Sequence, residues 1–216
     1  DAVGLWSAVL AVGALLGTLS ELGLPQVLVR YGAKFDAEGR LARLSALFAF
    51  SLRVFFVAAL VMVGVLLLAG PYAARILGTS VVDRWLLILG YLAMASGSLR
   101  AVNNAVFRGL RRMVAMAVLE ILFSTLVTVG YFLLRHRLTV DLALWVFLGA
   151  SLLVAGAGGI LLTALLARLR RETTAPAETG GVFREVRGFW EGVAVSGILL
   201  IAIEQLDKPL LAMLVS

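Results

Sequence analysis

Long apolar runs separated by short polar turns dominate this sequence. A helix that crosses a bilayer needs about 20 mostly apolar residues. Six runs reach that length: Gly4–Arg30, Ser45–Ala69, Asp83–Phe107, Met113–Leu134, Val140–Ala167 and Phe189–Ser216. None shows the alternation of apolar and polar residues that is typical of a membrane β-strand. The pattern therefore predicts an all-α fold, a polytopic membrane helix bundle with six transmembrane helices.

The composition favours the same conclusion. Hydrophobic residues make up 62% of the 216 residues and charged residues only 15%, whereas a soluble domain is about one quarter charged. The chain contains no cysteine, which excludes disulfides and thiolate metal sites.

Basic residues are distributed unevenly between the turns. The ends and turns that follow the first, third and fifth runs hold most of them: Arg30, Lys34, Arg40, Arg43, Arg100, Arg108, Arg111, Arg112, Arg168, Arg170, Arg171, Arg184 and Arg187. The other two turns hold Arg75, Arg84, Arg135 and Arg137. Because Lys and Arg are enriched in cytoplasmic loops, we expect the first run to begin outside the cell. The basic cytoplasmic rim attracts anionic membrane lipids, by about 1 kcal/mol per cation near the surface.

The chain is expected to be part of a longer membrane protein. Its first run enters from outside without a preceding inbound helix, and its last run stops at Ser216. The polar segment Arg168–Gly188 contains proline and a glycine pair and is typical of a flexible cytoplasmic linker. It divides the chain into helices of an N-terminal lobe, residues 1–167, and the first helix of a C-terminal lobe, residues 189–216, like the seam of a two-lobed transporter.

The stretch LSELGLPQVLVRYG carries an acid and a proline within the first apolar run. Pro25 has no N–H, so the carbonyl of Glu21 loses its helical partner and a kink is expected. Free backbone groups and ionisable side chains persist in a membrane only where they face protein or water. We therefore expect Glu21 to face the bundle interior or an aqueous cavity, either as a functional group or as the partner of an arginine.

Three other runs carry charges in their cytoplasmic halves. Arg53 lies two turns into the second run, where it either snorkels to the interface or faces a cavity. Arg100 forms a polar stripe with Asn103–Asn104, and a stripe of that length favours a cavity over lipid. Glu120 on the fourth run is placed to neutralise Arg100 or Arg108.

The last run contains the polar stretch IEQLDKP. Glu204 and Lys208 have the spacing of a pair within one helix, which leaves Asp207 without a local partner. Pro209 frees a second backbone carbonyl. The group is either an anchor at the external interface or part of a site, because interrupted helices in matching halves of a transporter point to its binding site.

No set of residues supports catalysis. AGAGGI at Ala155–Ile160 resembles a phosphate-binding loop, but it lies within an apolar run, where small residues favour close helix packing. Gly13 and Gly17 are interpreted in the same way. His136 is the only histidine, and one imidazole makes neither a metal site nor a catalytic triad. We expect no cofactor, no metal and no nucleic-acid partner.

Three stretches carry a resemblance to a known family. GLWSAVLAVGALLGTLSELGLPQVLVRYGAKF has a glycine-bearing start and an acid-Leu-Gly-Leu turn followed by an arginine and an aromatic residue, at Glu21, Leu22, Gly23, Leu24, Arg30 and Tyr31. AVFRGLRRM and EQLDKPLLAMLVS follow, the latter with Asp207 and Lys208. They resemble the second helix, an inner turn and the seventh helix of bacterial polysaccharide (Wzx-type) flippases, in the multidrug/oligosaccharidyl-lipid/polysaccharide exporter superfamily.

This resemblance implies a MATE-like helical lobe in the cytoplasmic membrane of a bacterium or archaeon. The implied substrate is an oligosaccharide linked to undecaprenyl diphosphate, which is moved between leaflets by alternating access for polysaccharide biosynthesis. Guanidinium groups bind phosphate bidentately, so the candidate substrate-binding residues are cations: Arg30, Arg53, Arg100 and Lys208. The candidates for charge balance, or for coupling to H⁺ or Na⁺, are Glu21, Glu120 and Asp207.

Two alternatives stay open. A multidrug or small-molecule antiporter of the same superfamily would use an acidic, cation-binding cavity, which the excess of arginine argues against. A membrane-embedded glycosyltransferase or polymerase component would need a large loop with catalytic carboxylates. The longest loop, Arg168–Gly188, shows no such catalytic arrangement.

Overall fold

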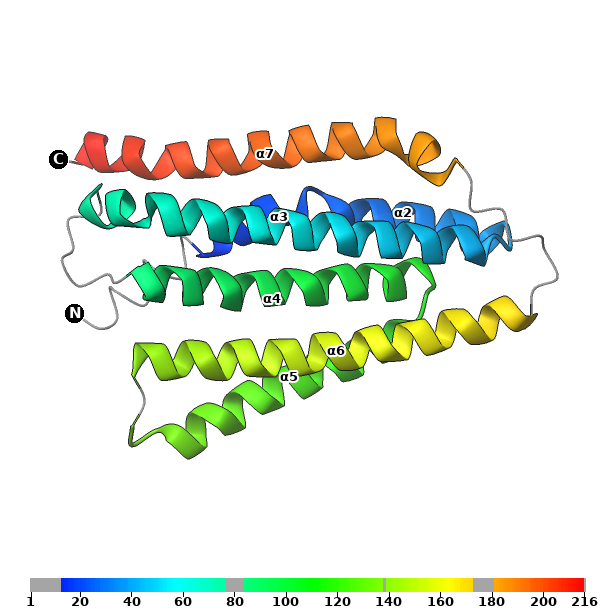
Figure 1. Cartoon of the computed structure of the whole chain (residues 1–216), viewed down its shortest axis with the longest axis horizontal. Coiled ribbons are helices and arrows are strands. Elements are labelled where there is room, and N and C mark those ends of the chain that lie inside the picture. Colours follow the sequence, from blue (N-terminus) through cyan, green and yellow to red (C-terminus); the bar gives the residue numbers. More distant parts are fainter. Residues whose placement is uncertain (1–12, 77–83, 138, 173–180, 216) are drawn as a thin grey trace.

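A computed structural model describes residues 13–76, 84–137, 139–172 and 181–215 (Figure 1). Residues 13–21 form the end of one helix. Six further helices follow: α2 Leu24–Ala37, α3 Leu41–Ile76, α4 Arg84–Gly109, α5 Met113–Leu134, α6 Val140–Glu172 and α7 Val182–Val215. No strand occurs in these ranges, so the predicted all-α bundle is confirmed.

Four helices are long and apolar enough to cross a membrane, over Leu41–Leu68, Trp85–Gly109, Met113–Leu134 and Val140–Leu169. They match four of the predicted runs to within a few residues. Many of their large apolar side chains point outward; Leu68 is 81% exposed and Val114 79%, as expected for surfaces that lie against lipid and not against water. The chain is a multi-pass membrane protein. The first predicted run reaches into residues 1–12, and the last into side chains beyond Leu199, which lie outside the described part.

The predicted end of the second run at Ala69, before the turn residues Gly70 and Pro71, is wrong, because α3 continues through both residues to Ile76. A proline removes one helical hydrogen bond and bends the helix locally, but the leucines and alanines on either side of it are strong helix formers. With 36 residues, α3 is about 54 Å long, which exceeds the roughly 30 Å hydrocarbon core. Its ends therefore extend beyond the apolar part of the membrane.

The linker predicted over Arg168–Gly188 is helical at both ends, because α6 continues to Glu172 and α7 begins at Val182. The first turns of α7 are amphipathic: Val182 and Val186 are buried, and Arg187 forms an ion pair with Glu191 one turn further, with 2.6 Å between Nε and Oε1. Such a pattern supports a helix at the membrane surface. The central residues of the predicted linker, 173–180, lie outside the described part, and the division into two lobes stays a prediction.

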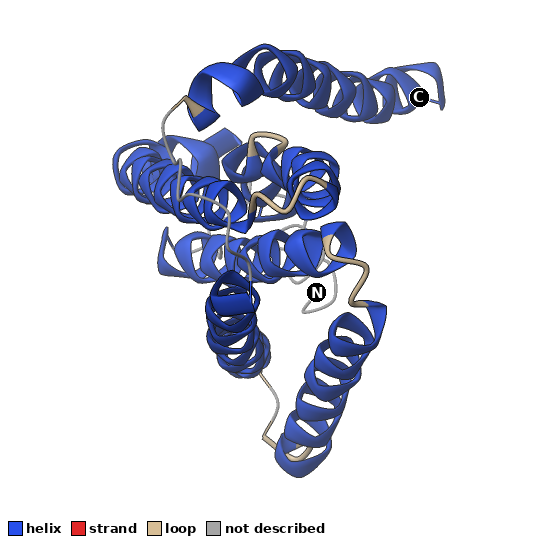
Figure 2. Cartoon of the chain, turned by 90° about the vertical axis from the view of Figure 1, so that its right-hand side faces the viewer, coloured by secondary structure: helices blue, strands red, loops and turns tan. Residues whose placement is uncertain are grey.

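The helix α4 lies at the centre of the bundle and packs against α2, α3, α5 and α6. All helices run roughly along one axis; α7 covers one side, next to α2 and α3, and α5 and α6 form the opposite side (Figure 1). The end view shows α5 projecting away from the other helices (Figure 2). Leu119 is the one residue of α5 that is buried, so this helix is held by few contacts.

Two glycines allow α2 and α4 to touch through their backbones. A Cβ atom added to Gly109 would lie 3.1 Å from the Cα atom of Gly32 and 3.1 Å from the carbonyl oxygen of Leu28. Small residues of this kind let membrane helices approach closely. The crossing fixes α2 against α4 near the ends that the charge distribution assigns to the cytoplasm.

The predicted packing role of the AGAGGI stretch is confirmed. A Cβ atom on Gly158 of α6 would lie 3.2 Å from Leu119 Cδ1 and 3.3 Å from Asn103 Nδ2. The same Asn103 amide donates a 2.8 Å hydrogen bond to the Ala155 carbonyl. The small residues of α6 thus receive side chains from α4 and α5, and no phosphate-binding loop is formed.

Candidate functional site

The proline in the first predicted run lies beside a complete helix break. The helix of residues 13–21 stops at Glu21, Leu22 and Gly23 have positive φ angles of 47° and 70°, and α2 begins with Pro25 in its first turn. Proline is favoured there because the N–H groups of a first turn have no helical partner. The break also frees carbonyl groups, and that of Leu22 accepts a 2.9 Å hydrogen bond from the indole Nε1 of Trp190 on α7.

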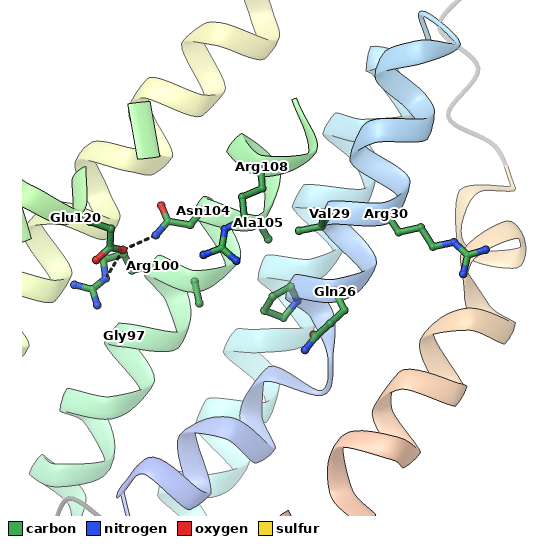
Figure 3. A pocket seen from close by; sticks show the side chains of 11 residues that line it. Gln26, Val29, Arg30, Gly97, Arg100, Asn104, Ala105, Arg108 and Glu120 are labelled. Carbon is green, nitrogen blue, oxygen red and sulfur yellow. Dashed lines mark hydrogen bonds and ion pairs between the residues drawn. The ribbon is translucent and has the colours of Figure 1, made fainter. Parts of the chain in front are cut away.

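A cavity of about 470 Å³ lies between α2, α4 and α5 (Figure 3). Its wall contains three arginines and one carboxylate among small and polar residues: Pro25, Gln26, Val29, Arg30, Gly97, Arg100, Ala101, Asn104, Ala105, Arg108 and Glu120. The helix break places the start of α2 on one wall, Arg100 and Asn104 lie on the wall formed by α4, and Glu120 lies on the wall formed by α5.

Arg100 is the centre of the polar contacts in this cavity. Its Nε atom lies 3.5 Å from Glu120 Oε1, and its guanidinium carbon lies 3.4 Å from the centroid of the Phe123 ring. Asn104 donates a 2.5 Å hydrogen bond to the same carboxylate oxygen. Arg100 is therefore held between an acid and an aromatic face of α5, an arrangement that suits a planar, delocalised cation.

Two polar atoms of this cluster are buried and have no hydrogen-bond partner in the described part of the chain: Nη1 of Arg100 and Oδ1 of Asn104. A buried donor or acceptor left unpaired costs about 1–3 kcal/mol, and more when the group is charged. The Arg100 side chain is only 15% exposed. Arg100 thus keeps an unpaired donor group of the kind that an anionic oxygen accepts from, and Asn104 keeps an unpaired acceptor of the kind that a hydroxyl group donates to.

The other predicted site residues are arranged differently. Arg30 lines the cavity, but its guanidinium points away from Arg100 toward α7 (Figure 3), where it lies 4.2 Å from the centroid of the Phe189 ring. Arg53 lies outside the cavity. It is exposed on the face of α3 that also carries Phe56 and Val57, which favours snorkelling to the interface.

Glu21 lies apart from the arginine cavity. It is partly buried and lines a separate cavity of about 60 Å³ beside Val193 and Gly197 of α7. Gln26 lines both cavities. Glu21 thus lines a cavity, one of the two surroundings expected for it, and an arginine is not among its described contacts.

Asp207 and Lys208 belong to α7, which continues as a helix through Pro209. Their side chains lie outside the described part, so their predicted roles stay predictions.

Sequence reasoning missed Arg108 and Gln26 as cavity residues. Arg108 had been assigned to the cytoplasmic turn, but it lines the cavity from the last turn of α4, with its Nε 3.2 Å from Met116 Sδ. The spacing of Arg100, Asn104 and Arg108 at i, i+4 and i+8 was the available signal, because residues four apart share a helix face.

A second polar cluster joins the start of α7 to α2 and α3. The Glu185 carboxylate lies 2.5 Å from Lys34 Nζ and 3.1 Å from Arg43 Nη1, and its backbone oxygen accepts a 3.1 Å hydrogen bond from Tyr31. The hydrogen bond from Lys34 lowers the pKa of Glu185 and, in return, raises the pKa of Lys34. Both groups are therefore charged at neutral pH.

Acidification is expected to weaken the attachment of α7. Because the pKa of Glu185 is lowered by folding, its contribution to stability is present above the unfolded value of about 4.3 and is lost as the pH falls through the lower folded value. Because the pKa of Lys34 is raised by folding, its contribution to stability is complete below the unfolded pKa of about 10.4. That contribution is lost only as the pH rises through the higher folded pKa. We expect Glu185→Gln to lower the melting temperature at pH 7. The difference in melting temperature between this variant and the unchanged protein should become smaller toward pH 4.

The melting temperature of the detergent-purified full-length protein measures this effect. Glu38→Gln is the control, because Glu38 lies at the same rim but pairs with Arg40 in its own turn, 3.1 Å away. An unchanged difference between pH 7 and pH 4 for Glu185→Gln would contradict the assignment.

Within the described residues, no group of three or more His, Asp or Glu side chains could hold a metal ion. No protein-family model matches this chain, and no match is found among curated proteins or among solved structures.

Proposed function

We propose that the full-length protein carrying this chain is a flippase, not an enzyme, that moves an oligosaccharide linked to undecaprenyl diphosphate across the cytoplasmic membrane by alternating access. One observation carries the proposal: in a multi-pass membrane protein, the wall of a cavity of about 470 Å³ contains an arginine, Arg100, that is 15% exposed and whose Nη1 has no hydrogen-bond partner. The resemblance of its sequence to polysaccharide flippases agrees with it.

The diphosphate is the part of such a lipid that cannot enter hydrocarbon, because a charge removed from water must be paired. Arg100 and Arg108 would pair with the phosphate oxygens, Arg100 through its free Nη1. The amide oxygen of Asn104 would accept a hydroxyl of the first sugar. The volume lies in the range of protein sites that enclose small molecules, about 300–1,000 Å³, and the polyprenyl chain would remain in the bilayer.

Glu120 gives this cavity a resting state. Its carboxylate lies 3.5 Å from Arg100 Nε, and an arriving diphosphate would compete with it for the same guanidinium. We assign Glu21, in the separate cavity beside α7, to coupling with H⁺ or Na⁺, and Asp207 to the same role on α7. Arg30 would respond to movement of α7 through its contact with Phe189.

The alternative functions fit this cavity less well. A drug antiporter that binds cations needs a net negative cavity, whereas this wall holds Arg100 and Arg108 against Glu120 alone, even without Arg30, whose guanidinium points toward α7. A glycosyltransferase needs paired carboxylates near a bound sugar, and Glu120 is the one carboxylate in the described wall.

Reconstitution tests the proposal. Proteoliposomes with the full-length protein and an undecaprenyl-diphosphate oligosaccharide are expected to transfer the lipid between leaflets, measured by its accessibility to a membrane-impermeant lectin, at least about tenfold faster than protein-free liposomes. Absence of this acceleration, with transport of a cationic dye against a proton gradient, would favour the antiporter. Lengthening of the oligosaccharide would favour the glycosyltransferase.

A further inference from the structure

A second cationic cavity lies at the basic rim, outside the site described above. It has a volume of about 360 Å³ and is formed by the turn between α4 and α5 together with the end of α6. Two arginines and five apolar residues line it: Phe107, Arg112, Ala115, Leu161, Leu165, Arg168 and Leu169. The two guanidinium groups in this lining suit it to an anion.

The order of these residues along α6 matches the order of groups in a phospholipid. Leu161, Leu165 and Arg168 lie at i, i+4 and i+7, on one face of the helix. Arg168 is nearest the rim, while Leu165 and Leu161 lie one and two turns deeper in the membrane. Arg112 faces the same cavity from the α4–α5 turn. A phosphate at the two arginines would therefore have its acyl chain directed along the two leucines.

We propose that this cavity binds one anionic phospholipid, with its phosphate held by Arg112 and Arg168 and an acyl chain lying along Leu161 and Leu165. Basic cavities between membrane helices on the cytoplasmic side are suited to such headgroups. A free phosphate would use the arginines but leave the leucines unused. The inference rests on the charge and depth of this cavity and does not depend on the proposed transport function.

Native mass spectrometry of the full-length protein in detergent tests the inference, with phosphatidylglycerol, phosphatidylcholine and inorganic phosphate as separate probes. We expect one phosphatidylglycerol to remain bound at concentrations where phosphatidylcholine does not. The double substitution Arg112→Gln with Arg168→Gln should weaken that binding about tenfold or more. Arg135→Gln with Arg137→Gln, at the turn between α5 and α6, is the matched control and should bind normally.

Three results would overturn the inference: equal retention of the two phospholipids, unchanged phosphatidylglycerol binding in the Arg112 and Arg168 double variant, or equal binding of inorganic phosphate alone. The pair Arg112→Lys and Arg168→Lys provides a second variant that keeps both charges. It should retain more lipid than the glutamine pair and less than the unchanged protein, because lysine cannot bind phosphate bidentately.

Discussion

Replacing Arg100 with alanine is expected to reduce transport of the lipid-linked oligosaccharide at least about tenfold. The substitution removes the buried guanidinium that has a free N–H group for an anionic oxygen, and a hydrogen bond between charged groups contributes about 1.5–3 kcal/mol. It also leaves Glu120 without its cation, so the cavity becomes less attractive to a diphosphate. Leaflet transfer in proteoliposomes measures the effect at matched protein content.

Arg53→Ala is the matched control for this result. It also removes an arginine from a membrane helix, but Arg53 is exposed on the outer face of α3 and does not line the cavity. We expect its transport rate to stay within about twofold of the unchanged protein, because an exposed charge contributes little to a remote site. Equal losses in the two variants would show that the cavity is not the diphosphate site. Arg100→Lys should give an intermediate rate, since the charge is kept and the bidentate geometry is lost.

Replacing Glu120 with glutamine is expected to strengthen the binding of the diphosphate and to slow its transport. The amide oxygen of glutamine can still accept the hydrogen bond from Asn104, but the charge that competes with the diphosphate for Arg100 is gone. Two opposite charges about 4 Å apart attract strongly in a partly buried site. We therefore expect undecaprenyl diphosphate to bind about tenfold more tightly and leaflet transfer at saturating substrate to become several-fold slower, because release is impeded.

Binding titration and transport at saturating substrate are both needed for this variant. Asp141→Asn is the control, because Asp141 is an exposed acid in the first turn of α6 and does not line the cavity. Weaker binding by the Glu120→Gln protein would mean that Glu120 supports the bound anion, and the charge-balancing role assigned to it would then be wrong.

The membrane helices were predictable because the bilayer imposes their length and composition. Four apolar runs locate four helices to within a few residues. Arg100 and Asn104 of the predicted polar stripe line a cavity, whereas Asn103 packs against α6. Glu120 was expected to neutralise Arg100 or Arg108, and it pairs with Arg100. In each case a strong constraint acts: hydrocarbon excludes polar groups, and a buried guanidinium requires an acid or an aqueous space.

The orientations of Arg30 and Arg53 could not be predicted in the same way. Leu22 and Gly23 have left-handed backbone conformations, so α2 begins with a new helical phase, and the direction of Arg30 cannot be extrapolated from the preceding residues. The helix α3 is apolar on all sides around Arg53, because lipid and protein interior both favour apolar residues. Periodicity then does not identify the inner face.

The backbone crossing of α2 and α4 restricts which wall of the arginine cavity is free to move. Because Gly32 and Gly109 leave no side chain between these helices, two of the three walls behave as one rigid body. Widening of the cavity then falls to α5, the helix with the fewest buried residues, which also carries Glu120. A swing of α5 would separate Glu120 from Arg100. The charge of Arg100 would then no longer be neutralised, so each opening of the cavity would also raise the positive electrostatic potential inside it.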